Sequence, residues 1–227
     1  MNFIPVKTPE FVKSLFPSFV WNINTSQKEV YLTFDDGPTP KVTDWVIHQL
    51  HLYNAKATFF CIGNNIDLYP EIFQRVVSSG HSIGNHTYNH LKGWKTSSQE
   101  YTNNTKKTEA LLKRQLESSE SFNNNLSVQF KLFRPPYGKI KPSQSKAILK
   151  LGYNIILWDI LSFDWDQSIS PEKCATNIIS NTNSGSIIVF HDSVKAFKNL
   201  EYALPKVLEY YSKKGFEFKA ITKQSLE

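Results

Sequence analysis

The sequence predicts an α/β fold, a distorted (β/α) barrel of about seven parallel-strand units. Short runs rich in β-branched and aromatic residues alternate with segments of helical periodicity, and helix start and stop residues flank those segments. The 227 residues suffice for one domain with its own core, to which residues 1–27 are an appended segment expected to pack on the barrel. Regular alternation implies parallel strands joined by right-handed crossovers, with an open doubly wound sheet as the alternative.

The elements follow in chain order. Strands are expected at 28–34, 57–62, 81–85, 131–133, 154–158, 186–190 and 216–220. Helices are expected at 40–53, 70–79, 98–116, 143–151, 171–182 and 200–214. Thr39 before Pro40 is typical of a helix cap, and Ser97 with Glu100 has the form of a capping box. The Ser/Asn-rich stretch 117–127 is expected to be a surface loop.

Composition excludes several classes of protein. Hydrophobic residues make up 40% and aromatic residues 14% of the chain, which is too many for a disordered protein. The formal charge is +6, but the sequence contains no run of five basic residues and no recognition motif, so we expect no specific nucleic-acid partner. Cys61 and Cys174 make no disulfide framework and are expected to be free thiols.

Membrane and targeting signals are also missing from the sequence. No uncharged apolar stretch reaches the ~20 residues that a spanning helix needs, so no transmembrane segment is expected. The N-terminus lacks the pattern of a cleavable signal peptide, which predicts a cytoplasmic protein or one otherwise without such a peptide. The oligomeric state is left open by the sequence.

Ionisable residues follow five of the expected strands, at the edge where parallel α/β folds bind ligands. They are Asp35 with Asp36, His86 with His90, Arg134, Asp159 with Asp164, and His191 with Asp192. Each group alone has an ordinary alternative, such as capping acids, an exposed arginine or a core histidine. All five groups at one rim predict an active site.

A divalent metal is the first expectation for that site. Asp36, His86 and His90 supply one carboxylate and two imidazoles, which leaves positions open for water and substrate. In a helix, the four-residue spacing of the two histidines would place both on one face. Zinc fits these donors best, with cobalt, nickel or manganese as alternatives.

The remaining polar residues suggest partner roles. Arg134 is a candidate anchor for the acidic pair Asp35 and Asp36, and His191 is a candidate general acid because histidine titrates near neutrality. Trp165 and Tyr137 suit the face of a sugar ring, although either side chain is equally suited to a core.

The ordered segments TFDDGP, HTYNH, RPPYG, DW and HD resemble the polysaccharide deacetylases of the NodB-homology type, carbohydrate esterase family 4. The similarity extends roughly from Tyr31 to Ile221. It implies a distorted barrel and metal-dependent removal of N-acetyl groups from an N-acetylated sugar or polysaccharide, with release of acetate. The alternatives are a metal amidohydrolase acting on a non-sugar N-acyl or cyclic amide, and a non-catalytic glycan-binding module.

The resemblance also implies a role for each matched residue. Asp35 corresponds to the catalytic base, Arg134 to the residue that holds it, and His191 with Asp164 to the acid and its partner. The metal ligands correspond to Asp36, His86 and His90, and the substrate and oxyanion positions to Pro135, Tyr137, Trp165 and Val189. Two positions depart from the family pattern: Phe163 replaces a frequent arginine, and Val189 replaces a more usual leucine.

Overall fold

The computed structural model describes residues 5–117 and 131–227, and the expected loop at 117–127 lies almost wholly outside them. Its strands are β1 (Phe19–Val20), β2 (Glu29–Asp35), β3 (Thr58–Cys61), β4 (Ser82–Asn85), β5 (Lys131–Phe133), β6 (Tyr153–Ile156), β7 (Ile160–Leu161), β8 (Ile187–His191) and β9 (Glu217–Phe218). The helices are α1 (Glu10–Leu15), α2 (Val42–Leu52), α3 (Gly63–Leu68), α4 (Pro70–Ser78), α5 (Ser98–Glu117), α6 (Pro142–Lys150), α7 (Pro171–Ile179), α8 (Phe197–Lys213) and α9 (Lys223–Leu226).

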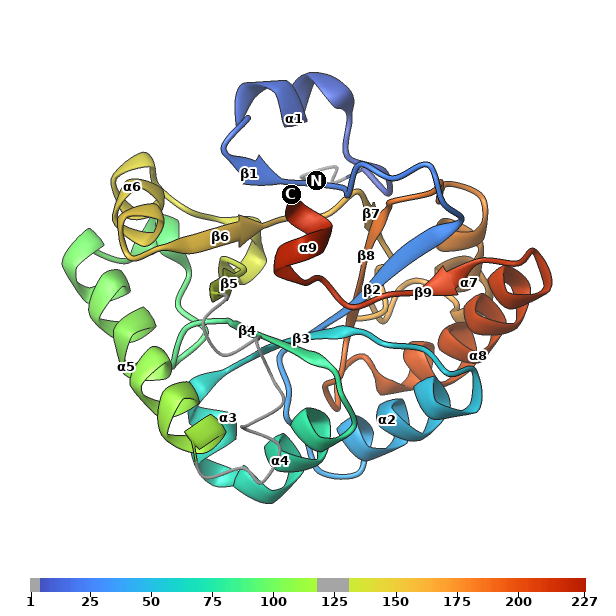
Figure 1. Ribbon diagram of the computed structural model, residues 1–227, viewed down its shortest axis with the longest axis horizontal. Helices are drawn as coiled ribbons and strands as arrows, with labels where there is room; N and C mark the ends of the chain where they lie inside the picture. The colour runs from blue at the N-terminus through green and yellow to red at the C-terminus, as the bar shows by residue number, and fades with distance from the viewer. Residues whose placement is uncertain (1–4, 118–130) are drawn as a thin grey trace.

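The strands form one curled parallel sheet in the order β1-β6-β5-β4-β3-β2-β8-β7, and β9 adds to β2 in parallel. Most of the helices surround the outside of the curl, as Figure 1 shows, whereas the short helix α9 lies within it. The predicted distorted barrel is therefore confirmed. β1 and β7 were not predicted, because two-residue strands carry no periodic pattern.

Two apolar layers hold the curl together. The larger lies between the sheet and the outer helices and includes Phe34, Phe59 and Phe190, whose rings stack on one another. The smaller lies inside the curl and consists of Ile23, Tyr31, Phe60, Leu132, Ile156, Ile187 and Ile221. Because side chains alternate along a strand, this inner layer identifies which residues of each strand face the barrel interior.

The segment before β2 covers the seam between the two ends of the sheet (Figure 1). β1 pairs with β6, while Lys7 forms an antiparallel bridge with Ile160 of β7. The Lys13 ammonium lies 2.8 Å from a carboxylate oxygen of Asp159. Asp159 precedes β7 and so lies at the amino end of the strands, which makes its expected place at the active rim wrong.

Several helix ends differ from expectation. The helix expected from Pro40 begins at Val42, because Lys41 adopts a φ of 68° that no α-helix admits. Ser97 does accept the Glu100 backbone N–H at 3.2 Å, as the capping box predicts. No helix in 5–117 or 131–227 is both long and apolar enough to cross a membrane. Both cysteines are buried and free, as expected.

Candidate metal centre and active site

Because side chains alternate along a strand, the predicted site residues Asp35 and His191 both face the barrel interior. On β2, Tyr31 lies in the inner apolar layer, so Asp35, four residues later, faces the same side. On β8, Ile187 has the same relation to His191. Asp35 and His191 are also register partners in the β2–β8 ladder. The last inward position of each strand therefore carries an ionisable group above an apolar floor.

Arg134 holds Asp35 from inside the barrel. Its side chain is fully buried, and its Nη1 donates to Asp35 Oδ1 and to the Thr33 hydroxyl, both at 2.7 Å. The other guanidinium nitrogens donate to the carbonyls of Ile156 and Leu157 at 3.2 and 3.0 Å. A buried charge is tolerated only when it is paired and its donors are satisfied. Arg134 meets both conditions, and it fixes the Asp35 carboxylate in position.

Asp36, His86 and His90 converge on one point. Each offers one ligand atom, and these atoms lie within 4.8 Å of one another. Asp36 Oδ1 is 3.2 Å from His90 Nε2 and 3.7 Å from His86 Nε2. This oxygen is buried without a hydrogen-bond partner among the described residues. Because buried polar atoms are almost always satisfied, the unpartnered oxygen beside two imidazole nitrogens fits a divalent metal.

The histidine ring orientations suit metal binding. His86 Nδ1 lies 2.8 Å from the carbonyl oxygen of Arg134, so Nδ1 carries the proton and Nε2 has a free lone pair facing Asp36. Burial lowers the pKa of His86 to about 4, and burial also lowers the pKa of His90. Burial alone would raise the pKa of Asp36, but the nearby His191, His86 and His90 lower it overall. The site thus offers two neutral imidazoles and one carboxylate.

The turn between the two histidines is not helical, so helical spacing does not explain why the two rings meet. β4 ends at Asn85, and Thr87 and His90 have φ values of 61° and 52°. Asn85 Oδ1 accepts the Thr87 N–H at 2.9 Å, and Asn104 on α5 accepts two further N–H groups of the turn at 2.7 and 3.0 Å. These amides fold the turn back so that both rings meet Asp36.

Asn65 and Thr43, which the sequence did not point to, hold the Asp36 turn together with Asp192, which was predicted at this rim. Asn65 on α3 donates to the Asp36 carbonyl at 2.7 Å. The buried Asp192 accepts the Gly37 N–H at 3.0 Å and the Thr43 hydroxyl at 2.6 Å. A Cβ on Gly37 would lie 2.0 Å from Asp192, so only glycine fits there. Asp192 follows His191 in sequence, but nothing in the sequence indicates that its side chain binds the turn at Asp36 and Gly37.

His191 and Asp164 form the second charged pair of the site. His191 Nδ1 lies 2.8 Å from Asp164 Oδ1, and the His191 backbone N–H donates to Oδ2 at 2.7 Å. Burial alone would lower the pKa of His191, but the attraction of Asp164 outweighs burial and raises it to about 9. Because Nδ1 is bound to Asp164, Nε2 is the nitrogen available for proton transfer to a ligand.

Residues 22–156 match the family model for polysaccharide deacetylases. The chain belongs to the polysaccharide deacetylase family. A peptidoglycan-N-acetylglucosamine deacetylase of Bacillus cereus is 34% identical over 194 residues, which are 85% of this chain and 66% of that protein. The chain thus spans just under two thirds of the length of this relative. The family resemblance drawn from the motifs is confirmed.

Two further relatives agree with this assignment. A chitooligosaccharide deacetylase of Azorhizobium caulinodans is 31% identical over 75% of this chain and 76% of its own length. The crystal structure of a peptidoglycan N-acetylglucosamine deacetylase, bound to a substituted N-oxidanyl-benzamide, is 32% identical and covers 96% of both chains with a TM-score of 0.82.

The residues to which the resemblance assigns substrate contacts lie around Asp36, His86 and His90. The Tyr137 ring contacts the His90 ring at a centroid distance of 4.6 Å, on a turn where Pro135 and Pro136 are buried. Trp165 lies edge-on to His191 at 4.8 Å. Val189 is buried one inward position below His191, which fits a pocket wall. The roles that the resemblance gives these residues remain predictions.

Phe163, the departure from the family pattern, stacks on Trp165 with ring centroids 5.0 Å apart. An arginine there would add a cation beside Asp164. With phenylalanine, this wall of the site is aromatic, and Asp164 keeps His191 as its charged partner.

The backbone of the rim is strained. Positive φ values occur at Asp36, Thr87, His90, Tyr137 and Phe163, all within the motif loops. Left-handed backbone costs a non-glycine residue about 1–2 kcal/mol, and such strain collects where surrounding contacts impose it, typically at functional sites. No sequence signal marks these positions, because none of them is glycine.

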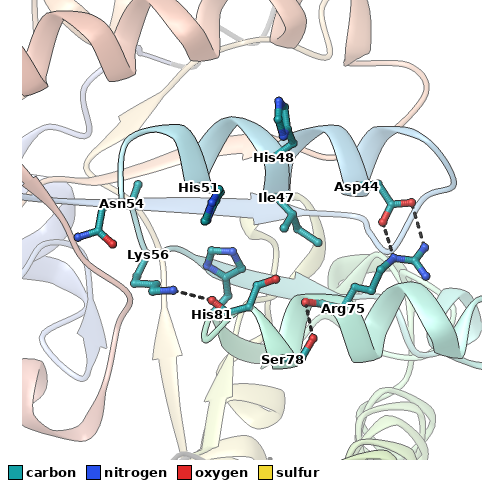
Figure 2. A pocket seen from close by; sticks show the side chains of 11 residues that line it. Asp44, Ile47, His48, His51, Asn54, Lys56, Arg75, Ser78 and His81 are labelled. Atoms are coloured by element: carbon teal, nitrogen blue, oxygen red, sulfur yellow. Dashed lines mark hydrogen bonds and ion pairs between the residues drawn. The ribbon is translucent and has the colours of Figure 1, made fainter.

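A separate hollow lies on the outside of the barrel, between α2 and α4 (Figure 2). Its volume is about 390 Å³. Asp44 and Arg75 form a paired contact across it at 2.7 and 3.0 Å, and Lys56 donates to the Ser79 carbonyl at 2.6 Å. Burial lowers the pKa of the His81 ring to about 4. These groups satisfy one another, and the hollow contains none of the predicted site residues.

Proposed function

We propose that this protein hydrolyses the N-acetyl amide of N-acetylglucosamine units in a polysaccharide, releasing acetate. The observation that carries the proposal is the buried, unpartnered Asp36 Oδ1 beside two neutral imidazoles, within reach of an acid and a base. Family membership and the peptidoglycan and chitooligosaccharide relatives support this substrate class.

The metal ligands in this proposal are Asp36, His86 and His90, and the metal is zinc. One carboxylate and two imidazoles are donors that zinc accepts in catalytic sites with open positions. When bound, zinc supplies Lewis-acid chemistry, which polarises the amide oxygen and makes water more acidic.

Asp35 serves as the general base. Its carboxylate takes a proton from the attacking water, while the positive charge of Arg134 at 2.7 Å stabilises the carboxylate and orients it. The Tyr137 backbone N–H donates to the oxygen that gains negative charge as the carbonyl carbon becomes tetrahedral. The left-handed turn at Tyr137, with a φ of 62°, directs this N–H and presents the ring beside His90.

His191 serves as the general acid. An amine leaves an amide only when it is protonated, so the reaction needs a proton donor on the leaving side. His191 is paired with Asp164 through Nδ1, and its Nε2–H delivers the proton. After product release, Asp35 and His191 exchange one proton each with water, and the site returns to its starting state.

Acetate release from purified peptidoglycan and from N-acetylated chitooligosaccharides tests the proposal. We expect about one equivalent of zinc in protein purified without chelator, as one three-ligand site requires. The double variant His86→Ala/His90→Ala should lose both metal and acetate release. The matched control His48→Ala/His51→Ala removes two exposed histidines of α2 and should retain both. Acetate release by the first variant at the wild-type rate would refute the proposal.

A further inference from the structure

Two turns that are far apart in sequence meet beside the metal centre. One is the 3₁₀ turn Gly93–Lys95 and the other is the 3₁₀ turn Pro136–Gly138. The buried amide of Gln144 donates to the carbonyls of Gly93 and Thr96 at 2.9 and 3.2 Å, and its oxygen accepts the Lys141 N–H at 2.9 Å. These bonds hold the first turn against Lys141, and Trp94 Nε1 donates to the Ile140 carbonyl at 3.4 Å, so the first turn is fixed to the segment that directly follows the second.

The surface of these turns carries a strip of basic and aromatic side chains, which we call the basic strip: Lys92, Trp94, Lys95, Tyr137 and Lys139. The Lys92 ammonium lies 4.8 Å from the Tyr137 ring centre, and the Lys139 ammonium lies 5.0 Å from the Trp94 ring centre. Trp94 and Tyr137 are 60% and 54% exposed, which is unusual for such large apolar groups. The Tyr137 ring contact with His90 connects the strip directly to the metal ligands.

The charge of the strip is not neutralised. Residues 86–99 and 134–150 contain no aspartate or glutamate. Among the described residues, none of the ion pairs involves Lys92, Lys95 or Lys139. On the loop that carries Trp165, by contrast, the neighbouring charged residues are the acids Asp164 and Asp166. The rim of the site is therefore positive on the Tyr137 side.

We propose that the basic strip binds sugar units adjacent to the one that is deacetylated and selects glycans whose sugars carry carboxylates over neutral glycans. The inference rests on the proposed function and names the class of its substrate. Exposed aromatic faces suit the apolar faces of sugar rings, while a ring-held ammonium without an acidic partner suits a carboxylate. Electrostatic complementarity of this kind gives specificity between otherwise similar ligands.

Three tetrasaccharides of equal length test the selection: neutral N-acetylated chitotetraose, a peptidoglycan tetrasaccharide with free peptide carboxylates, and the same peptidoglycan tetrasaccharide with its carboxylates amidated. The test variant is Lys92→Gln/Lys139→Gln. Its control is Lys206→Gln/Lys214→Gln, which removes the same charge from α8 and its end; Lys214 also lies over an aromatic ring, that of Tyr210, at 4.5 Å.

For the free-carboxylate glycan we expect the test variant to raise KM about 5- to 10-fold with little change in kcat, as the loss of two exposed charge pairs predicts. KM for the two glycans without free carboxylates should change by less than about 2-fold, and the control variant should leave all three values unchanged. Trp94→Ala should raise KM for all three glycans, because ring stacking does not depend on substrate charge.

An equal effect of Lys92→Gln/Lys139→Gln on the charged and amidated glycans would overturn the inference, even if all three glycans release acetate. If none of the glycans releases acetate, the proposed function is wrong. Calorimetric binding of the free-carboxylate glycan then tests whether the basic strip binds carboxylates. Weaker binding to the test variant than to the control variant supports the strip in that case, and equal binding overturns it.

Discussion

The two ends of the barrel contain similar buried ion pairs with different surroundings. At the carboxyl end, Asp35 is bound by Arg134 at 2.7 Å; at the amino end, Asp159 is bound by Lys13 at 2.8 Å. Both carboxylates are buried. Asp159 also accepts the Ser186 hydroxyl at 2.6 Å, which ties the N-terminal segment to the start of β8.

The two ion pairs differ in the groups that surround them rather than in their own contacts. Beside Asp35, a buried oxygen of Asp36 has no hydrogen-bond partner among the described residues, and the loops carry left-handed backbone. Beside Asp159, the contacts are the ammonium groups of Lys13 and Lys7, the Ser186 hydroxyl and regular backbone pairs. A buried ion pair alone thus indicates only a structural contact. Unsatisfied buried atoms and strained turns beside such a pair distinguish a reactive site.

Neutralising each carboxylate should give the largest difference in effect between the two ends of the barrel. Asp35→Asn should lower kcat by about 10²-fold or more while retaining zinc, because it deletes the base and spares the ligands. Asp159→Asn should leave kcat within about 3-fold of wild type and lower the free energy of unfolding by about 1–3 kcal/mol, the loss typical of a charged hydrogen bond. Acetate release, metal content and urea denaturation measure these effects. A kcat near wild type for Asp35→Asn would exclude it as the base.

Removing the cation of each ion pair should lower the free energy of unfolding more at the carboxyl end than at the amino end. Arg134→Met leaves Asp35 buried without its partner and should lower the free energy of unfolding by about 3–5 kcal/mol. Lys13→Met should cost about half as much, because Asp159 retains the Ser186 hydroxyl and the Lys7 ammonium at 3.8 Å, and the Lys13 side chain is 10% exposed. Urea denaturation with metal-free protein separates these values from metal binding. Equal losses for the two variants would show that the ends of the barrel tolerate an unpaired carboxylate equally.

The sequence predicted most of the charged residues at the carboxyl end of the barrel, but not the position of Asp159 at the amino end. Strand ends and motif residues such as Asp35 and His191 are visible in the sequence because each follows a hydrophobic run directly. Asp159 follows such a run too, and it was placed at the wrong end. The chain passes from β6 around to the start of β7 between residues 156 and 160, and a strand of two residues gives no signal of that crossing.

The contacts that shape the site were beyond sequence reasoning for a similar reason. Asn104 and Gln144 hold turns that lie more than ten residues away from them, and polar residues on a helix are normally taken as solvent-exposed. The basic strip also escaped detection, because Lys92 and Lys139 are distant in sequence and form no run. The sequence predicts the ionisable residues of the site, and long-range hydrogen bonds determine how those residues meet.

Histidines at the two ends should titrate in opposite directions. The pKa of His191 is raised to about 9, so its contribution to stability is complete below its ordinary pKa near 6.5 and is lost as the pH rises through 9. The pKa of His81, at the amino end of β4, is lowered to about 4, so stability is lost as the pH falls from 6.5 to 4. NMR titration of metal-free protein measures both rings, and Asp164→Asn should return His191 towards 6.5. An unchanged His191 titration in that variant would show that Asp164 is not its charge partner.

The smallest expected effect concerns strained backbone at and away from the rim. Lys41, before α2, has φ 68° and ψ −43°, a γ-turn conformation that is unfavourable for any residue with a Cβ. Lys41→Gly should therefore raise the free energy of unfolding by about 0.5–1 kcal/mol, since the relief of strain exceeds the added flexibility of the unfolded chain. Its kcat should not change, because Lys41 lies outside the catalytic loops.

Tyr137→Gly relieves a similar strain at the metal centre, where the φ is 62°. It also removes the ring that contacts His90 and frees the turn that directs the proposed oxyanion donor. We therefore expect stability to change by less than about 1 kcal/mol, while kcat falls about 10-fold or more as the N–H loses its fixed direction. Urea denaturation and acetate release on both variants give the comparison. If Tyr137→Gly keeps the wild-type kcat, the left-handed turn at Tyr137 is a feature of folding, like the strained turn at Lys41, and not of catalysis.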